Sequence, residues 1–142
     1  MNELDDINDL GHWSTKIDVP INSYGFIYLI TNTSTGKKYI GKKQMLTTQK
    51  RKPLKGKVNK RHSIVSTDWK TYTSSCNDLN KDIETYGKDK FTFEILQFCN
   101  SKSELAYFEA KEQFSREVLL KEDYYNGIIN LRIGKIKNFK KT

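Results

Sequence analysis

The fold is decided by the stretch Gly25-Phe-Ile-Tyr-Leu-Ile-Thr-Asn-Thr-Ser-Thr-Gly-Lys-Lys-Tyr-Ile-Gly41. Residues 25–31 are rich in β-branched and aromatic side chains, which is typical of a strand. Residues 32–36 have the composition of a turn. Residues 37–41 then predict a returning strand, so the whole stretch predicts a β-hairpin.

Each strand of this hairpin carries one tyrosine. A turn centred between Thr33 and Ser34 predicts that Tyr28 and Tyr39 face each other on one side of the hairpin. Gly41 lies on the same side, and because it has no side chain, a ligand is expected to approach the sheet closely there. The plain alternative is an aromatic pair that packs a core.

Two helices and a further strand are predicted downstream. A capping-box pattern at Ser75 opens a helix that ends at Gly87. Residues 91–98 alternate in the manner of a strand. A second capping-box pattern at Ser101 opens a helix that reaches about Leu120. We expect a small α/β (α+β) domain with a mainly antiparallel three-stranded sheet flanked by helices.

The 142 residues are enough for one hydrophobic core. We expect an acidic N-terminal leader at 1–22, one domain at 23–134 and a basic C-terminal tail at 135–142. Within the domain, residues 42–67 form a basic insertion with weak periodicity. We interpret this insertion as a long loop with at most one short helix. A loop of this length in a compact domain is usually functional or disordered.

The distribution of charge points to a polyanion as partner. The formal net charge is +8, yet no Asp or Glu occurs between Val19 and Thr67. Residues 37–61 hold eleven Lys or Arg. Such a block repels itself, so it is best explained by contact with nucleic acid, although a solubilising surface is the ordinary alternative.

Other classes of protein find no support in the composition. Cys76 and Cys99 form no CxxC pair and have too few partners for a zinc site. No apolar run approaches the roughly 18 residues of a membrane span, and the acidic start is unlike a signal peptide. We expect a cytoplasmic protein and no membrane partner.

The second helix carries charges on an apolar stripe. At 100° per residue, one stripe contains Leu105, Phe108, Leu119 and Leu120 together with Glu109, Glu112 and Arg116. Carboxylates on such a stripe are costly unless they are paired or hold a metal. The sequence leaves open whether they pair with Arg116 or bind a cation.

The tyrosine motifs resemble those of a known family. Phe26-Ile-Tyr28, ten intervening residues and Tyr39-Ile-Gly41 look like the signature of the GIY-YIG nucleases, with a Glu-bearing helix and an Asn downstream. The resemblance covers about residues 24–130. The stretches at 42–44, 68–75 and 107–111 look like those of small phage-encoded members. In this chain Phe26 stands where the family has its first glycine.

The resemblance implies a metal-dependent DNA endonuclease that hydrolyses phosphodiester bonds. It implies one Mg²⁺ (or Mn²⁺) ion held by Glu109 or Glu112, and a proton taken from water by Tyr28 or Tyr39. The resemblance further implies that the catalytic residues are Tyr28, Tyr39, Gly41, Lys42, Arg51, Glu109 and Asn126.

Two further positions remain ambiguous within the resemblance. The family arginine aligns with Gln49, so Arg51 is the nearest candidate and Arg61 or His62 are alternatives. Asn126 competes with Asn130 for the family asparagine. The residues expected to contact DNA are Lys43, Lys50, Arg51, Lys52, Lys55, Lys57, Lys60 and Arg61.

Two other functions stay possible from the sequence. One is a non-catalytic DNA-binding module on the same fold, since Phe26 and the missing arginine depart from the motif. The other is an RNA-binding accessory protein, which rests only on basicity and aromatic content. The resemblance to phage members places the protein in the cytoplasm of a bacterial or phage-infected cell.

Overall fold

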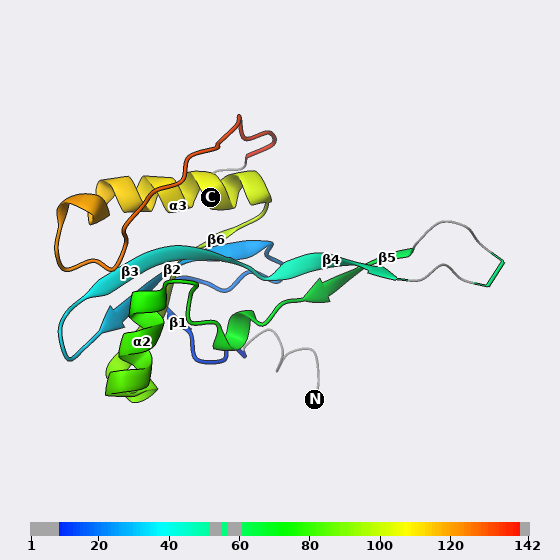
Figure 1. The fold of residues 1–142 in the computed structure, drawn as a ribbon. Helices are drawn as coiled ribbons and strands as arrows, with labels where there is room; N and C mark the ends of the chain where they lie inside the picture. Colours follow the sequence, from blue (N-terminus) through cyan, green and yellow to red (C-terminus); the bar gives the residue numbers. More distant parts are fainter. Residues whose placement is uncertain (1–8, 52–54, 57–60, 140–142) are drawn as a thin grey trace.

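The computed structural model describes residues 9–51, 55–56 and 61–139 (Figure 1). Its main sheet has four strands in the order β1-β6-β2-β3, and α2 and α3 lie on opposite faces of it. The elements around this sheet are β1 (Ser14–Thr15), β2 (Gly25–Asn32), β3 (Lys38–Gln44), β6 (Phe91–Cys99), α2 (Asn77–Tyr86), α3 (Lys102–Ser115) and the 3-10 turns η1 (Trp69–Thr71), η2 (Lys88–Lys90) and η3 (Val118–Leu120). The expected fold class is confirmed. No described helix is long and apolar enough to cross a membrane.

The sheet has one strand more than expected because the N-terminal segment joins it. β1 pairs in parallel with β6, and the preceding residue, Trp13, is only 4% exposed. The Trp13 indole N–H donates to the Trp69 carbonyl, and its ring packs edge-on against Phe26. The expectation of a leader over 1–22 is therefore wrong for Trp13–Thr15, which belong to the core.

The hairpin register differs from the expected one by two residues. Tyr28 lies opposite Gly41, and Tyr39 lies opposite Ile30. Because a shift of two preserves the alternation of a strand, both tyrosines still share one face. Their rings are tilted neighbours, with centroids 6.1 Å apart.

The turn explains this shift. Asn32 N–H donates to the Lys37 carbonyl, so the turn is centred between Ser34 and Thr35, one residue later than expected. Asn32 is fully buried, and its side-chain oxygen accepts the Ser34 N–H. Gly36 adopts a φ of +79°, a conformation that L side chains rarely adopt.

The sheet separates two hydrophobic clusters. Tyr28 belongs to the cluster beneath α2, with Trp13, Phe26, Ile30, Trp69, Leu79, Phe91, Phe93, Ile95 and Tyr125. The cluster beneath α3 contains Ile27, Ile40, Cys99, Leu105 and Val118. Phe26 is fully buried. The residue that replaces the motif glycine therefore fills the core against Trp13 and Trp69.

The basic insertion is a β-ribbon and not the expected loop. β4 (Leu46–Arg51) and β5 (Arg61–Ser66) pair in antiparallel fashion and extend away from the main sheet (Figure 1). Ile64, in the middle of β5, is 74% exposed. A ribbon with an apolar residue this exposed is not held by burial, so its sequence shows no clear alternation of apolar and polar residues.

The second helix begins as predicted and ends early. The Ser101 side chain accepts the Glu104 N–H at 3.1 Å, which confirms the capping box. Glu117 then adopts a left-handed φ of 54°, which stops the helix. The predicted core positions Leu119 and Leu120 are wrong, since they are 47% and 78% exposed.

For the first predicted helix, α2, the end is confirmed and the start is wrong. Its stop at Gly87 is confirmed, because the Gly87 N–H caps the Ile83 carbonyl with a φ of +95°. The capping box at Ser75 is wrong, because α2 starts after Cys76 with no side-chain cap. Instead, the Ser74 hydroxyl accepts the Cys76 N–H.

Candidate functional site

The two motif tyrosines differ in exposure. Tyr28 is 1% exposed, and its phenol lies over Gly41. A side chain at Gly41 would collide with the Tyr28 hydroxyl and the Tyr39 ring. The expectation that Gly41 leaves room for a ligand is therefore wrong, because Tyr28 itself fills that room. Tyr39 is partly exposed and is the motif tyrosine that reaches solvent.

Both phenols are neutral at physiological pH. Burial, together with smaller contributions from Cys76, Glu109 and Tyr72, raises the pKa of Tyr39 to about 12. Burial raises the pKa of Tyr28 well above its ordinary value, with smaller contributions from Tyr39, Tyr72 and Glu109. A tyrosinate at this site therefore requires an added positive charge.

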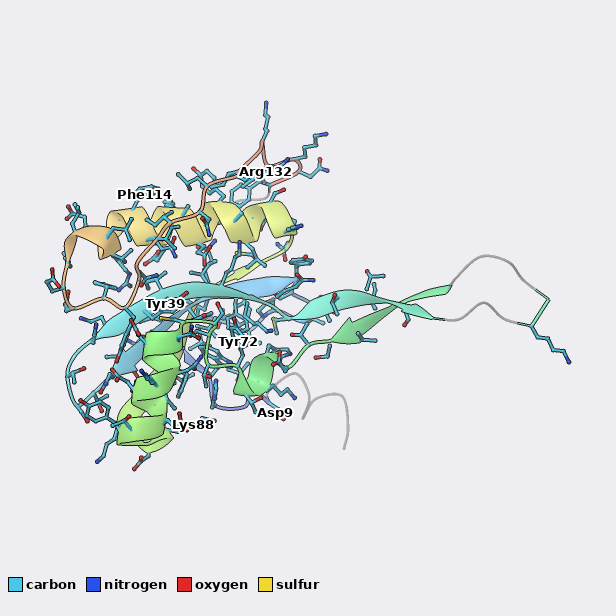
Figure 2. All side chains as sticks on the ribbon, in the orientation of Figure 1. Asp9, Tyr39, Tyr72, Lys88, Phe114 and Arg132 are labelled. Atoms are coloured by element: carbon cyan, nitrogen blue, oxygen red, sulfur yellow. The ribbon has the colours of Figure 1, made fainter. Side chains whose placement is uncertain are left out.

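A third tyrosine, which sequence reasoning did not assign to the site, joins this face. The Tyr72 ring lies 6.2 Å from that of Tyr28, on the side of the sheet that α2 covers (Figure 2). The Lys43 ammonium lies 4.1 Å from the Tyr72 centroid and pairs with Asp68 at 2.8 Å. The signal in the sequence was the phage-like stretch 68–75, which contains Tyr72.

Asn126 fastens the free edge of the sheet. Alternate residues of β3 direct their backbone groups outward, and Ile40 is the central one. The Asn126 side chain accepts the Ile40 N–H at 3.0 Å and donates to the Ile40 carbonyl at 2.8 Å. Gln113 also donates to that carbonyl, at 3.2 Å. Asn126 is therefore a buried clamp behind the motif, while Asn130 is exposed.

Glu109, in α3, contacts Lys42, the next residue of β3 after Ile40 whose backbone faces outward. Its carboxylate lies 3.6 Å from the Lys42 ammonium and accepts a hydrogen bond from the Lys42 backbone. The side chain is 20% exposed. Burial raises the pKa of Glu109, and Lys42 opposes that rise only in part. Because its charge raises the pKa of both Tyr28 and Tyr39, Glu109 lies within electrostatic reach of the two phenols.

Glu112 has a different environment. Its carboxylate accepts a hydrogen bond from the Arg116 side chain at 2.8 Å, and each side chain is about one-third exposed. The ion-pair explanation of the helical stripe thus holds for Glu112. Of the two carboxylates, Glu109 is the one whose charge contributes to the raised pKa of both tyrosines.

Comparison with known families agrees with this arrangement. Residues 12–129 match the family model described as "Putative endonuclease segE, GIY-YIG domain". The chain belongs to the GIY-YIG endonuclease family. The match covers most of the chain and includes Trp13 and β1, which the structure places in the fold. Neither curated proteins nor solved structures gave a match.

The residues at this site fit the divalent cation of the family only if water and substrate supply most of its ligands. Among the residues that the structure describes, no three His, Cys, Asp or Glu side chains gather into a cage. Glu109 is a single, partly buried carboxylate beside the tyrosine face. Mg²⁺ commonly takes one or two carboxylates and completes its shell with water and substrate phosphate. The donor set therefore suits an ion that is shared with a phosphodiester.

The family arginine has no clear equivalent at the tyrosines. Arg51 and Arg61 occupy paired positions at the outer end of the ribbon (Figure 1). In the part of the chain that the structure describes, Lys42 and Lys43 directly follow the motif and form ion pairs with Glu109 and Asp68. Of the expected DNA-contacting residues, Lys55 is exposed, and Lys52, Lys57 and Lys60 lie outside the described residues.

Proposed function

We propose that this protein is a metal-dependent endonuclease that hydrolyses phosphodiester bonds in DNA. The single observation that carries this proposal is the placement of Glu109. Its carboxylate is partly buried against Lys42 at the edge of β3, and its charge contributes to the raised pKa of Tyr39, the motif tyrosine that reaches solvent. A partly desolvated carboxylate with a raised pKa is typical of a functional site.

The residues divide the chemistry among themselves. Glu109 would hold one Mg²⁺ or Mn²⁺ ion, which, when bound, would stabilise negative charge on the phosphate oxygens. Tyr39 would orient the attacking water and accept its proton, since it is the partly exposed phenol. Tyr28, buried over Gly41, would fix the position of Tyr39. Lys43 would supply positive charge near the phosphate.

Lys42 would act as a placeholder for the cation. Its side chain is 45% exposed, so the ammonium can leave Glu109 for solvent or for a phosphate when the ion binds. This exchange would keep the Glu109 charge balanced both with and without the ion. Because the Lys42 side chain is exposed, the pair contributes little stability and the exchange would cost little.

A non-catalytic DNA-binding module is the second candidate, favoured by the same Lys42–Glu109 pair. If the pair is permanent, Glu109 is neutralised and no cation binds. The tyrosines would then remain neutral packing residues.

Nicking of a supercoiled plasmid distinguishes the two candidates. We expect the full chain to relax the plasmid with Mg²⁺ or Mn²⁺ and to be inactive with EDTA. Glu109→Gln should abolish nicking while plasmid binding persists, and Glu112→Gln should retain nicking. Binding by the wild type without any nicking in either metal would instead establish the non-catalytic module.

A further inference from the structure

The β4–β5 ribbon is a built element with a fixed base. Met45 N–H and Leu46 N–H both donate to the Tyr24 carbonyl, at 2.7 and 3.4 Å. Two donors on one acceptor form a β-bulge, which bends a strand. On the return strand, the Thr67 N–H donates to the Met45 carbonyl, and its hydroxyl donates to the Gln44 carbonyl at 2.6 Å. The ribbon therefore leaves the sheet in a direction that these bonds set.

The dimensions of the ribbon match a groove of duplex DNA. Six residue pairs connect β4 and β5, and Figure 1 shows the ribbon standing clear of the helices. Two strands lie about 4.8 Å apart, and the major groove is about 12 Å wide and admits a two-stranded ribbon. The minor groove, at about 6 Å, admits a ribbon only where the duplex is deformed, so an undistorted duplex accepts the ribbon in its major groove.

The register divides the ribbon into two different faces. On one face, Thr47 lies opposite Val65, Gln49 opposite Ser63 and Arg51 opposite Arg61. On the other face, Leu46 lies opposite Ser66, Thr48 opposite Ile64 and Lys50 opposite His62. Both arginines and the only glutamine of the ribbon strands thus share the first face, which we call the arginine face.

The arginine face carries the side-chain types that read base edges. Arginine pairs with O6 and N7 of guanine in the major groove, and glutamine pairs with N6 and N7 of adenine. The other face carries Lys50, His62 and the apolar Leu46 and Ile64, and it has no arginine or glutamine.

Charge identifies a nucleic acid as the occupant. The sequence around the ribbon has no acidic residue from Val19 to Thr67. We propose that the ribbon lies in the major groove of duplex DNA and that its arginine face, Gln49, Arg51 and Arg61 in particular, reads the sequence. This inference rests on the proposed function, because it takes DNA as the substrate. It adds the groove, the face and the specificity-determining residues.

Modified duplexes test the groove. The full chain in EDTA is used to select duplexes from a random-sequence pool, and the selected site is then rebuilt with altered guanines. Replacing guanine by 7-deazaguanine removes N7 from the major groove, and inosine removes only the minor-groove amino group. We expect 7-deazaguanine to weaken binding about tenfold or more and inosine to have little effect.

A charge-conserving variant tests the face. Arg51→Lys with Arg61→Lys keeps the net charge but loses the planar two-point donor. We expect this variant to lose about tenfold or more for the selected site and to keep its affinity for unselected DNA. Arg132→Lys is the matched control, since Arg132 is exposed and lies on the chain that passes over α3 (Figure 2). This control should bind as the wild type does.

The results separate this inference from the proposed function. A pool that yields no preferred sequence, or a selected site that is sensitive to inosine and not to 7-deazaguanine, would overturn the inference while plasmid nicking continued. Groove-dependent binding by a chain that never nicks would instead overturn the endonuclease and leave the inference standing.

Discussion

Tyr28 and Tyr39 carry the same phenol in different surroundings. Tyr28 is buried over Gly41, whereas Tyr39 reaches solvent. Spacing in the sequence could place both on one face, because alternation survives a shift of two residues. It could not predict which one is exposed, since that depends on the neighbours that α2 and Trp13 supply. Its exposure is why we propose the reactive role for Tyr39 and not for Tyr28.

Removing each hydroxyl tests this assignment. Tyr39→Phe should lower the nicking rate by about 10²-fold, as expected for loss of a general base. Tyr28→Phe should lower the rate less, because its hydroxyl is buried. Both variants should unfold in urea within about 1 kcal/mol of the wild type. Equal rates for wild type and Tyr39→Phe would remove Tyr39 from the chemistry.

The two candidate carboxylates, Glu109 and Glu112, could not be separated from the sequence, since both fall on the same helical stripe. The structure separates them by partner. A raised pKa means that folding favours the protonated form of Glu109, so this group stabilises the fold in acid. That contribution is lost as pH rises through the raised pKa.

We therefore expect Glu109→Gln to keep or raise the melting temperature at pH 7. The difference from wild type should shrink towards pH 4, where the wild-type carboxyl is protonated. Glu112→Gln should lower stability by about 0.5 kcal/mol at pH 7, because it loses the pair with Arg116. A sharp fall in melting temperature for Glu109→Gln at pH 7 would show that Lys42 pairing stabilises the fold.

At the scale of elements, local signals were predictable and those that depend on distant contacts were not. The capping box at Ser101 and the stop at Gly87 involve neighbours in the chain, and both are confirmed. The ribbon was missed because the periodicity of a strand reports burial, and Ile64 is largely exposed. The hydrogen bonds along the edge of β3 could not be predicted either, because they come from Asn126, far along the chain.

The clamp on β3 can be tested by removing the Asn126 amide. Asn126→Ala leaves the Ile40 N–H without its acceptor, while Gln113 still serves the carbonyl. We expect a loss of about 2 kcal/mol in urea unfolding. Asn130→Ala is the control and should be neutral, because Asn130 is exposed. Equal stability of both variants would show that the Asn126 bonds are dispensable.

The charge of the ribbon has a test of its own. If the basic insertion contacts about 5 phosphates, log K for DNA should fall with log[salt] at a slope near −4 to −5. Neutralising Lys50, Arg51 and Lys52 together should flatten that slope by up to about 3 units. Neutralising Lys135 and Lys137 is the comparison, and a larger effect there would place the phosphate contacts on the C-terminal tail.

At the scale of the whole molecule, the sheet is completed by a segment that composition alone placed outside the domain. The first 22 residues are acidic on average, and this average conceals Trp13. A two-residue parallel strand has no detectable period, and its pairing with β6 joins residues about 80 positions apart. Such a contact follows from packing around Phe26 and Phe93 and has no local signature.

Replacement of Trp13 should therefore destabilise the entire fold. Trp13→Ala should cost about 3–5 kcal/mol in urea unfolding, the usual range for a buried tryptophan. Ile21→Ala, in the same N-terminal segment, should have little effect because Ile21 is 80% exposed. Equal stability of the two variants would show that β1 is an appendage of the sheet.

The bend at Met45 and Leu46 has a consequence for where a bond would be cut. A single residue, Met45, separates the ribbon from β3, the strand that carries Tyr39. The direction of the ribbon is set by the hydrogen bonds to the Tyr24 carbonyl. Six residues of strand span about 20 Å, which corresponds to roughly six base pairs of duplex. The protein would thus measure a set distance from the bases it recognises to the phosphate it attacks, and lengthening β4 and β5 would move the cut along the DNA.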